Sequence, residues 1–212
     1  LVITFIASIF IGMSVLVARF TGADDHEKVN RIVYQGFLTA IFISLFILAP
    51  VGYFASPFLL SLVNAAPDVQ AEALSFLRIM FTCSVGLLIY FMVSGALRSA
   101  GDAKTPMVLG IIMTVLNLLL NIVFIRGLGP IPSFGTAGAA MGTCIASGVI
   151  GLYSLYKLQS GTWVIAFPKT GYAPDWKVIK KLFQFGLPAG IQGVAMNVGG
   201  VLSVIFSSGC ST

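Results

Sequence analysis

Charge is scarce in this sequence. Only 9% of its 212 residues are Asp, Glu, Lys or Arg, whereas an ordinary soluble domain has about 25%, and 58% are hydrophobic. The single histidine and the seven acidic residues all lie in or beside polar connecting segments. This composition excludes a soluble domain and predicts an all-α, polytopic helical membrane protein.

Catalytic and metal-binding motifs are also missing. The sequence contains no H-E-x-x-H, no G-x-S-x-G and no paired carboxylates inside an apolar run. Its three cysteines share no metal-ligand spacing, and we interpret them as small core residues. We therefore expect a protein that is not an enzyme and holds no metal. Basic residues in such a chain orient its loops, so no nucleic-acid partner is expected.

Six apolar segments are long enough to cross a hydrocarbon layer about 30 Å thick. Each must be helical, because a backbone in lipid has to satisfy its hydrogen bonds internally. Pro50 is expected to end or kink the second segment, and SPFLLSLV after it is expected to form a short interfacial helix. The segments cover residues 1–20, 32–50, 71–97, 106–125, 137–156 and 187–207.

Lysine and arginine are divided unequally between alternate loops. The first, third and fifth loops hold ten of them, the second holds none, and the fourth holds only Arg126. By the positive-inside rule, this bias places the odd loops in the cytoplasm. Arg78 remains, near the outer end of the third segment, where either snorkelling to the interface or a conformational lock would explain it.

The third loop, GALRSAGDAKTPM, reads as a tight corner between two helices. Gly101 can adopt the left-handed turn that ends the first helix. We expect Thr105 to cap the next helix and Pro106 to occupy its first position.

The fifth loop is long and basic. Its DWKVIKKLF stretch places apolar residues on one helical face and lysines on the other, as in a helix that lies on an anionic membrane surface. We interpret residues 1–158 as one helical bundle, 159–184 as a cytoplasmic linker and 185–212 as the first helix of a second bundle. Because the chain begins without Met inside an apolar run and ends just after another, we also interpret it as an internal piece of a longer protein.

Neutral polar residues recur in register inside the segments. Gly110, Thr114, Asn117 and Asn121 fall within about 60° of one another on a helix. A second stripe in the next segment contains Ala140, Thr143, Ser147 and Ser154. Two interpretations stay open: the stripes seal the helices through interhelical hydrogen bonds, or they line a polar cavity.

The last segment starts FGLPAGIQGVAMNVGG. Pro188 among closely spaced glycines predicts a bendable or discontinuous helix. Gln192 and Asn197 lie about 140° apart on that helix, so at most one of them can line a pathway.

Four stretches, in order, resemble the multidrug and toxic compound extrusion (MATE) family of secondary transporters. They are VARFTGADD, GALRSAGDAKTPM, NLLLNIVFIRGLGPIPSFGTAGAAMGT and FQFGLPAGIQ. The resemblance implies twelve helices in two six-helix lobes around a central cavity. It identifies the chain as about helices two to seven, a partial two-lobe bundle.

The resemblance also implies a function. It is the export of organic cations or amphiphilic compounds in exchange for H⁺ or Na⁺, by a monomeric protein of the plasma (inner) membrane, with no other cofactor. Asn117 and Thr143 match the Asn and Thr of a cation site found in one bacterial branch, whereas Asn121 stands where that branch has Asp. The candidate cavity residues are Asn117, Asn121, Thr143, Thr114, Gly110 and Gln192.

Two alternatives stay open. One is a flippase of the same superfamily that moves lipid-linked oligosaccharides, which should have a large basic cavity, although the apolar segments hold almost no internal cations. The other is a truncated membrane fragment that transports nothing.

Overall fold

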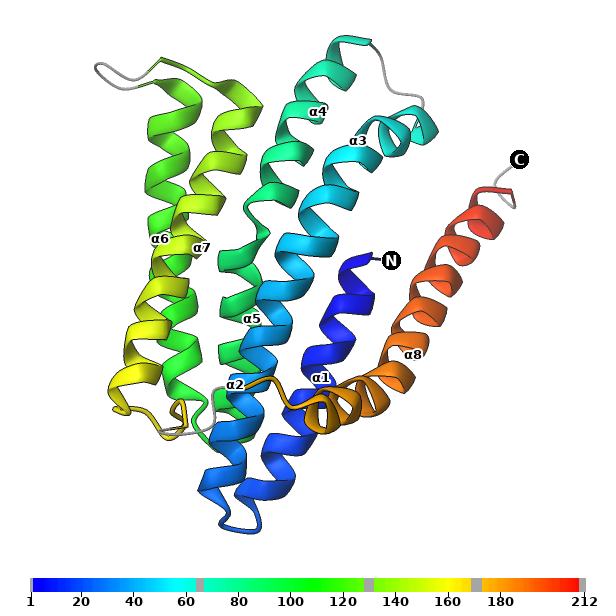
Figure 1. Cartoon of the computed structure of the whole chain (residues 1–212). Coiled ribbons are helices and arrows are strands. Elements are labelled where there is room, and N and C mark those ends of the chain that lie inside the picture. The colour runs from blue at the N-terminus through cyan, green and yellow to red at the C-terminus, as the bar shows by residue number, and fades with distance from the viewer. Residues whose placement is uncertain (1, 64–66, 128–131, 169–172, 210–212) are drawn as a thin grey trace.

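The computed structural model describes residues 2–63, 67–127, 132–168 and 173–209 (Figure 1). These residues form helices and contain no strand, so the predicted all-α fold class is confirmed. In chain order the elements are α1 (Val2–Thr21), α2 (His26–Phe42), the π-helix η1 (Ile43–Leu48), α3 (Ala49–Val63), α4 (Pro67–Thr82), α5 (Ser84–Ser99), α6 (Lys104–Arg126), α7 (Gly135–Ser160) and α8 (Trp176–Gly209).

The basic connections gather at one end of the bundle. The helix ends that flank the α1–α2, α5–α6 and α7–α8 connections all lie at the bottom of Figure 1, while those of α3–α4 and α6–α7 lie at the top. The alternation expected from the charge count is therefore present in the fold. Which end faces the cytoplasm stays a prediction from the positive-inside rule.

The second span is longer than the sequence suggested. Residues His26–Phe58 form one apolar helix that runs through α2, η1 and α3. Pro50 does not end it, and the segment expected to be a separate interfacial helix continues α3. The helix widens just before Pro50, where the Ala49 N–H donates to the Ser44 carbonyl five residues earlier. Such a π segment absorbs an irregularity without breaking the helix.

The third span, in contrast, is broken. Its halves, Ala73–Thr82 and Ser84–Ser99, meet at an angle of 55°. Two hydrogen bonds stabilise the break: Ser84 donates to the Phe81 carbonyl at 2.9 Å, and its hydroxyl lies 2.8 Å from that of Ser44 in η1. The broken span and the π-helical segment are thus joined by one buried pair of serines.

The corner at residues 95–107 has the predicted turn, but the residue that caps the N-terminus of α6 is not the predicted one. Gly101 has φ +91°, so the left-handed turn is confirmed. However, Asp102 rather than Thr105 caps α6, because its Oδ1 accepts the Thr105 N–H at 3.0 Å. Hydrogen bonding from Thr105 also lowers the pKa of the Asp102 carboxyl. α6 begins at Lys104, so Pro106 is its third residue and lies within the first turn.

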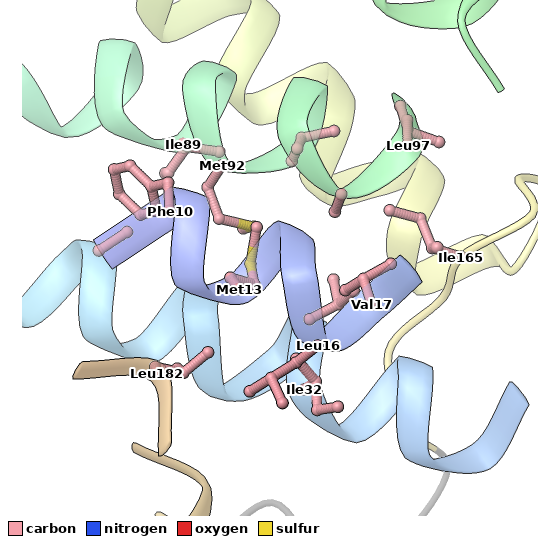
Figure 2. Close-up of a cluster of buried hydrophobic side chains, with 14 of the residues drawn as sticks. Phe10, Met13, Leu16, Val17, Ile32, Ile89, Met92, Leu97, Ile165 and Leu182 are labelled. Atoms are coloured by element: carbon pink, nitrogen blue, oxygen red, sulfur yellow. The ribbon is translucent and has the colours of Figure 1, made fainter. Parts of the chain in front are cut away.

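The core is built around α1. Met13 and Val17 of α1 are fully buried between α2 and α5, where they pack with Val33 and Met92 (Figure 2). α6 contributes far less, and most of its large apolar side chains are exposed. A membrane span needs no apolar partner on its lipid-facing side, so an exposed apolar surface is expected there.

Glycine sets the distance between α5 and α7. A Cβ added at Gly86 would lie 2.7 Å from the backbone nitrogen of Gly148, whereas one added at Gly148 would meet nothing within 4 Å.

We expect Gly86→Ala to destabilise the protein by about 1–3 kcal/mol, because the helix backbones must separate. Gly148→Ala is the matched control and should be neutral. Unfolding of both variants in detergent, followed by circular dichroism, checks this, and equal stabilities would contradict the α5–α7 packing.

Candidate substrate and cation site

Three of the predicted site residues meet between α6 and α7. Asn117 Nδ2 donates to Thr143 Oγ1 at 2.9 Å, and Asn121 Nδ2 donates to Asn117 Oδ1 at 3.0 Å. Thr143 Oγ1 in turn donates to the carbonyl of Ala139 at 3.0 Å. We call Asn117, Asn121 and Thr143 the amide cluster. Its chain of hydrogen bonds joins the two helices, as in the sealing interpretation of the stripes.

Glycines allow this close approach of α6 and α7. A Cβ at Gly138 would lie 2.5 Å from the carbonyl oxygen of Phe124, and one at Gly142 would collide with Asn121 Oδ1. That Oδ1 atom is buried and accepts no hydrogen bond within the described residues. The amide cluster therefore keeps one carbonyl oxygen without a hydrogen bond, and this oxygen can accept a hydrogen bond or coordinate a cation.

The other half of the α6 stripe lies apart from this cluster. Thr114 Oγ1 donates to the carbonyl of Gly110 at 2.9 Å within its own helix. Both residues line a pocket of about 490 Å³ between α5 and α6, together with Tyr90 and Arg98. A Cβ at Gly110 would come within 2.8 Å of the Tyr90 hydroxyl, so Gly110 leaves room for that ring.

A larger and more apolar pocket of about 580 Å³ lies among α1, η1, α4 and α5. Its volume is in the range of sites that bind drug-sized molecules. Ser14, Ser84 and Arg98 are among its few polar residues, and Arg98 also lines the smaller pocket. The wall carries the phenylalanines Phe10, Phe76, Phe81 and Phe91.

Sequence reasoning missed this aromatic wall. The four phenylalanines come from three helices, so no single helical periodicity connects them. The sequence shows 17 phenylalanines but does not indicate which of them share a wall. The break at Cys83 brings α4 and α5 residues to one wall, and that break was not expected.

Gln192 lies away from the amide cluster. Its side chain is exposed on α8, which packs against α1 and α2. The side chain of Asn197 lies outside the described residues. In the part of the chain that the structure describes, no three His, Cys, Asp or Glu residues are grouped as metal ligands would be.

Arg78 links α4 to α3 through a single side-chain contact. Its guanidinium lies 4.5 Å from the centroid of the Tyr53 ring, so a cation–π contact joins α4 to α3. The contact gives Arg78 a partner within the bundle.

Long apolar helices, backbones in close contact and pockets between helices together define a polytopic α-helical membrane protein. Three helices, His26–Phe58, Lys104–Arg126 and Gly135–Ser160, are each long and apolar enough to cross a bilayer, and the bent α4–α5 pair can form a fourth span.

The MatE family model matches residues 1–123, and the chain belongs to this family. It is 28% identical over 209 residues to the probable multidrug resistance protein YoeA of Bacillus subtilis (strain 168), covering 97% of this chain and 45% of the relative. It is 27% identical over 196 residues to the probable multidrug resistance protein NorM of Thermotoga maritima, covering 89% and 40%.

Solved structures show the same fold. The outward-facing conformation of a multidrug resistance MATE family transporter superposes with a TM-score of 0.82 at 23% identity, covering 92% of this chain and 43% of that one. The inward-facing conformation gives 0.79 at 23% identity, covering 92% and 44%. The chain thus spans less than half the length of these proteins.

Replacing Asn117 tests whether the amide cluster holds α6 to α7. Asn117→Leu removes the donor to the Thr143 hydroxyl and the acceptor of the Asn121 amide, so we expect a loss of about 1–2 kcal/mol of stability. Thr114→Val is the matched control on the same face of α6 and should change stability by less than about 0.5 kcal/mol. Unfolding of both variants in mixed detergent micelles measures the difference, and equal losses would remove the cluster's structural role.

Proposed function

We propose that the chain forms most of the N-terminal lobe and the first helix of the second lobe of a cation-coupled antiporter. The antiporter exports organic cations or amphiphilic compounds by alternating access, is driven by H⁺ or Na⁺, and acts as a monomer in the plasma (inner) membrane. Family membership and the names of the relatives support export of drugs.

The observation that carries the proposal is the pocket of about 580 Å³ among α1, η1, α4 and α5. Its size suits a drug-sized molecule, and its phenylalanine wall suits the flat apolar part of an amphiphile. Aromatic faces also attract cations, which favours an aromatic cation as substrate. Arg98 at the same pocket opposes cations nearby, so we place the cationic end of a substrate away from Arg98.

The coupling ion needs a group outside this part of the protein. Coupling requires that occupancy by H⁺ or Na⁺ change the relative stability of two conformations. The amide cluster contains amides and a hydroxyl, none of which titrates. We assign to Asn121 Oδ1, the spare acceptor, the role of one neutral ligand of a cation held mainly by a charged group elsewhere.

A flippase of lipid-linked oligosaccharides is less well supported. It would have to bind anionic headgroups, yet each of the two pockets described above contains a single cationic residue, Arg98.

Reconstitution tests the proposed function. In proteoliposomes, the full-length transporter that contains this chain should move an aromatic cation such as ethidium against a H⁺ or Na⁺ gradient. The 212-residue chain alone should show no ion-driven movement, because it supplies no titrating group at the amide cluster. Gradient-driven transport by the 212-residue chain would show that the coupling group lies within it.

Filling the apolar pocket tests where the substrate binds. Leu87 lines the pocket, so Leu87→Trp should lower ethidium transport by about tenfold while the protein still folds. Leu152→Trp is the matched control, because Leu152 is 70% exposed on α7 and is not among the residues that line the pocket. Initial efflux rates of the two variants, normalised to purified protein, give the comparison. Equal rates would place the substrate elsewhere.

A further inference from the structure

The connection between α7 and α8 is attached to α2 rather than free. Asn30 Oδ1 accepts the backbone N–H of Ala166 at 2.9 Å, and Ile165 beside it is fully buried. The ring of Phe167 packs edge-on against Tyr34 at 5.4 Å and also contacts Phe37. The described residues Ile165, Ala166 and Phe167 of this connection are therefore packed against the bundle.

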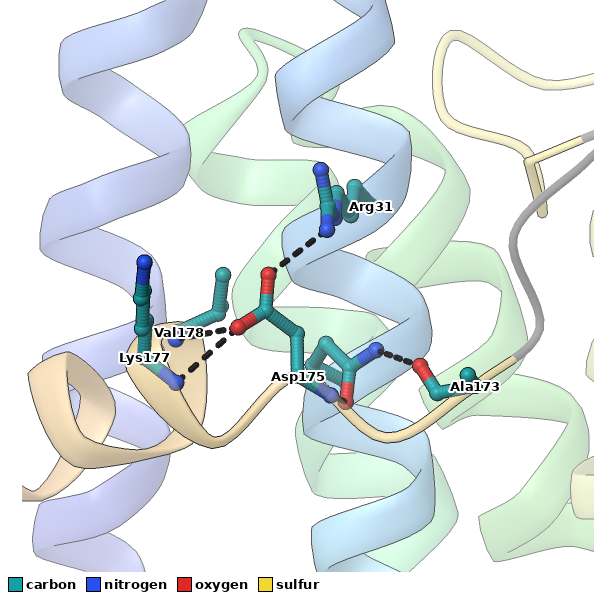
Figure 3. Close-up of polar contacts among 6 residues, drawn as sticks. Arg31, Ala173, Asp175, Lys177 and Val178 are labelled. Atoms are coloured by element: carbon teal, nitrogen blue, oxygen red, sulfur yellow. Dashed lines mark hydrogen bonds and ion pairs between the residues drawn. The ribbon is translucent and has the colours of Figure 1, made fainter.

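Gln35 provides the second attachment. Its side chain is 0% exposed although it belongs to an apolar helix. Its Nε2 donates to the carbonyl of Ala173 at 3.0 Å, and its Oε1 accepts the N–H of Asp175 at 3.1 Å (Figure 3). One buried amide therefore binds the backbone of the connection on both sides of Pro174. A buried amide that loses such partners is left unsatisfied, which strongly favours the attached state.

Asp175 extends the attachment into α8. Its Oδ2 lies 2.7 Å from Arg31 of α2, and its Oδ1 accepts the backbone N–H of Lys177 at 2.9 Å in the first turn of α8 (Figure 3). The same carboxylate thus caps α8 and pairs with α2. We call Asn30, Arg31 and Gln35 the linker dock.

Further along α8, one more close contact holds the helix, and several apolar side chains beyond it are exposed. Leu182 is fully buried, and a Cβ at Gly12 of α1 would lie 2.6 Å from the backbone nitrogen of Gly186, so the two helices touch there. After this point Leu187, Ile191 and Met196 are 49%, 63% and 71% exposed. Pro188 cannot donate a backbone hydrogen bond, so the helix is softened at the same place.

We propose that Gln35 and Asp175 are positioning residues that keep the start of α8 fixed to α2 throughout the transport cycle. The first turns of α8 then move with the N-terminal lobe, and the boundary between the two moving lobes lies within α8, beyond Gly186, instead of in the connection. This inference rests on the proposed function, since it concerns a cycle between two conformations.

Cross-linking within the dock tests this directly. In the full-length transporter with Cys83, Cys144 and Cys210 replaced by serine, Asn30→Cys and Ala166→Cys are joined by a reducible bifunctional methanethiosulfonate. We expect the cross-linked protein to keep at least half of its ethidium transport. A second pair, Val15→Cys with Ile191→Cys, ties the exposed part of α8 to an exposed position of α1 outside the pocket lining and should abolish transport until the link is reduced. Loss of transport in the first pair, restored by reduction, overturns the proposal whatever the second pair does.

A distance measurement keeps this test independent of transport. Spin labels at Glu27→Cys of α2 and Lys177→Cys of α8, both exposed positions, should give one narrow distance distribution. The distribution should be the same with and without H⁺ or Na⁺ gradient ions and ethidium. A second distance that appears with ions or ethidium overturns the dock, even in a protein that transports nothing. A protein that transports nothing but keeps the single distance refutes the proposed function alone.

Gln35→Leu tests whether the hydrogen bonds of Gln35 hold the connection to α2. It removes both hydrogen bonds to the connection and should raise the detached fraction by about thirtyfold, seen as a second, longer distance. Its turnover should fall while its affinity for ethidium stays unchanged, a split that general loss of folded protein would not produce. Gln184→Leu, at an exposed position of α8, is the control and should leave distance and turnover as they were. An unchanged distance and turnover in Gln35→Leu would overturn the proposal.

Discussion

Backbone contact at glycines is the constraint on which this bundle depends. Lipid tails are as apolar as leucine, so helices gain little from hiding apolar side chains from lipid and must be held by close packing and hydrogen bonds. Gly12 against Gly186, Gly86 against Gly148 and Gly138 against Phe124 each bring two helix backbones together. With these contacts in place, side chains such as Asn117 and Thr143 come within hydrogen-bond distance across the helix interface.

The buried polar groups follow from the same close approach. Ser44 pairs with Ser84 where the π-helical segment meets the broken span, and Asn117 pairs with Thr143 where α6 meets α7. The first pair joins the irregular segment η1 to the broken span, and the second joins α6, whose apolar side chains are mostly exposed, to α7. The α6–α7 stripe therefore holds the helices together and still leaves Asn121 Oδ1 available as an acceptor. The two interpretations that the sequence left open are compatible, because sealing uses only part of the hydrogen-bonding capacity of the stripe.

Much of the helical layout could be predicted from the sequence, since apolar length and alternating loop charge depend only on local composition. Features that depend on distant contacts could not. The break at Cys83 and the uninterrupted helix through Pro50 arise from packing among α3, α4 and η1. Asp102 replaces Thr105 as the cap of α6, because local sequence patterns place the start of a helix only to within about two to four residues. Gln35 offered one weak signal, an amide in an apolar helix, but its partners lie about 140 residues away.

The amide cluster also limits what this chain can contribute to the proposed ion coupling. A group that drives alternating access must change the relative stability of two conformations when an ion binds to it. A proton has this effect by changing the charge of the group that binds it. Asparagine and threonine keep the same charge in every state, so the cluster cannot respond to pH. It can offer oriented oxygens, of which Asn121 Oδ1 is the unused one. Neutral oxygens contribute to Na⁺ binding but leave its charge uncompensated in a medium of low dielectric constant. A carboxylate from another helix, next to Asn121, would supply both the missing charge and the titrating group, and α6 and α7 would then hold the neutral half of the site in place.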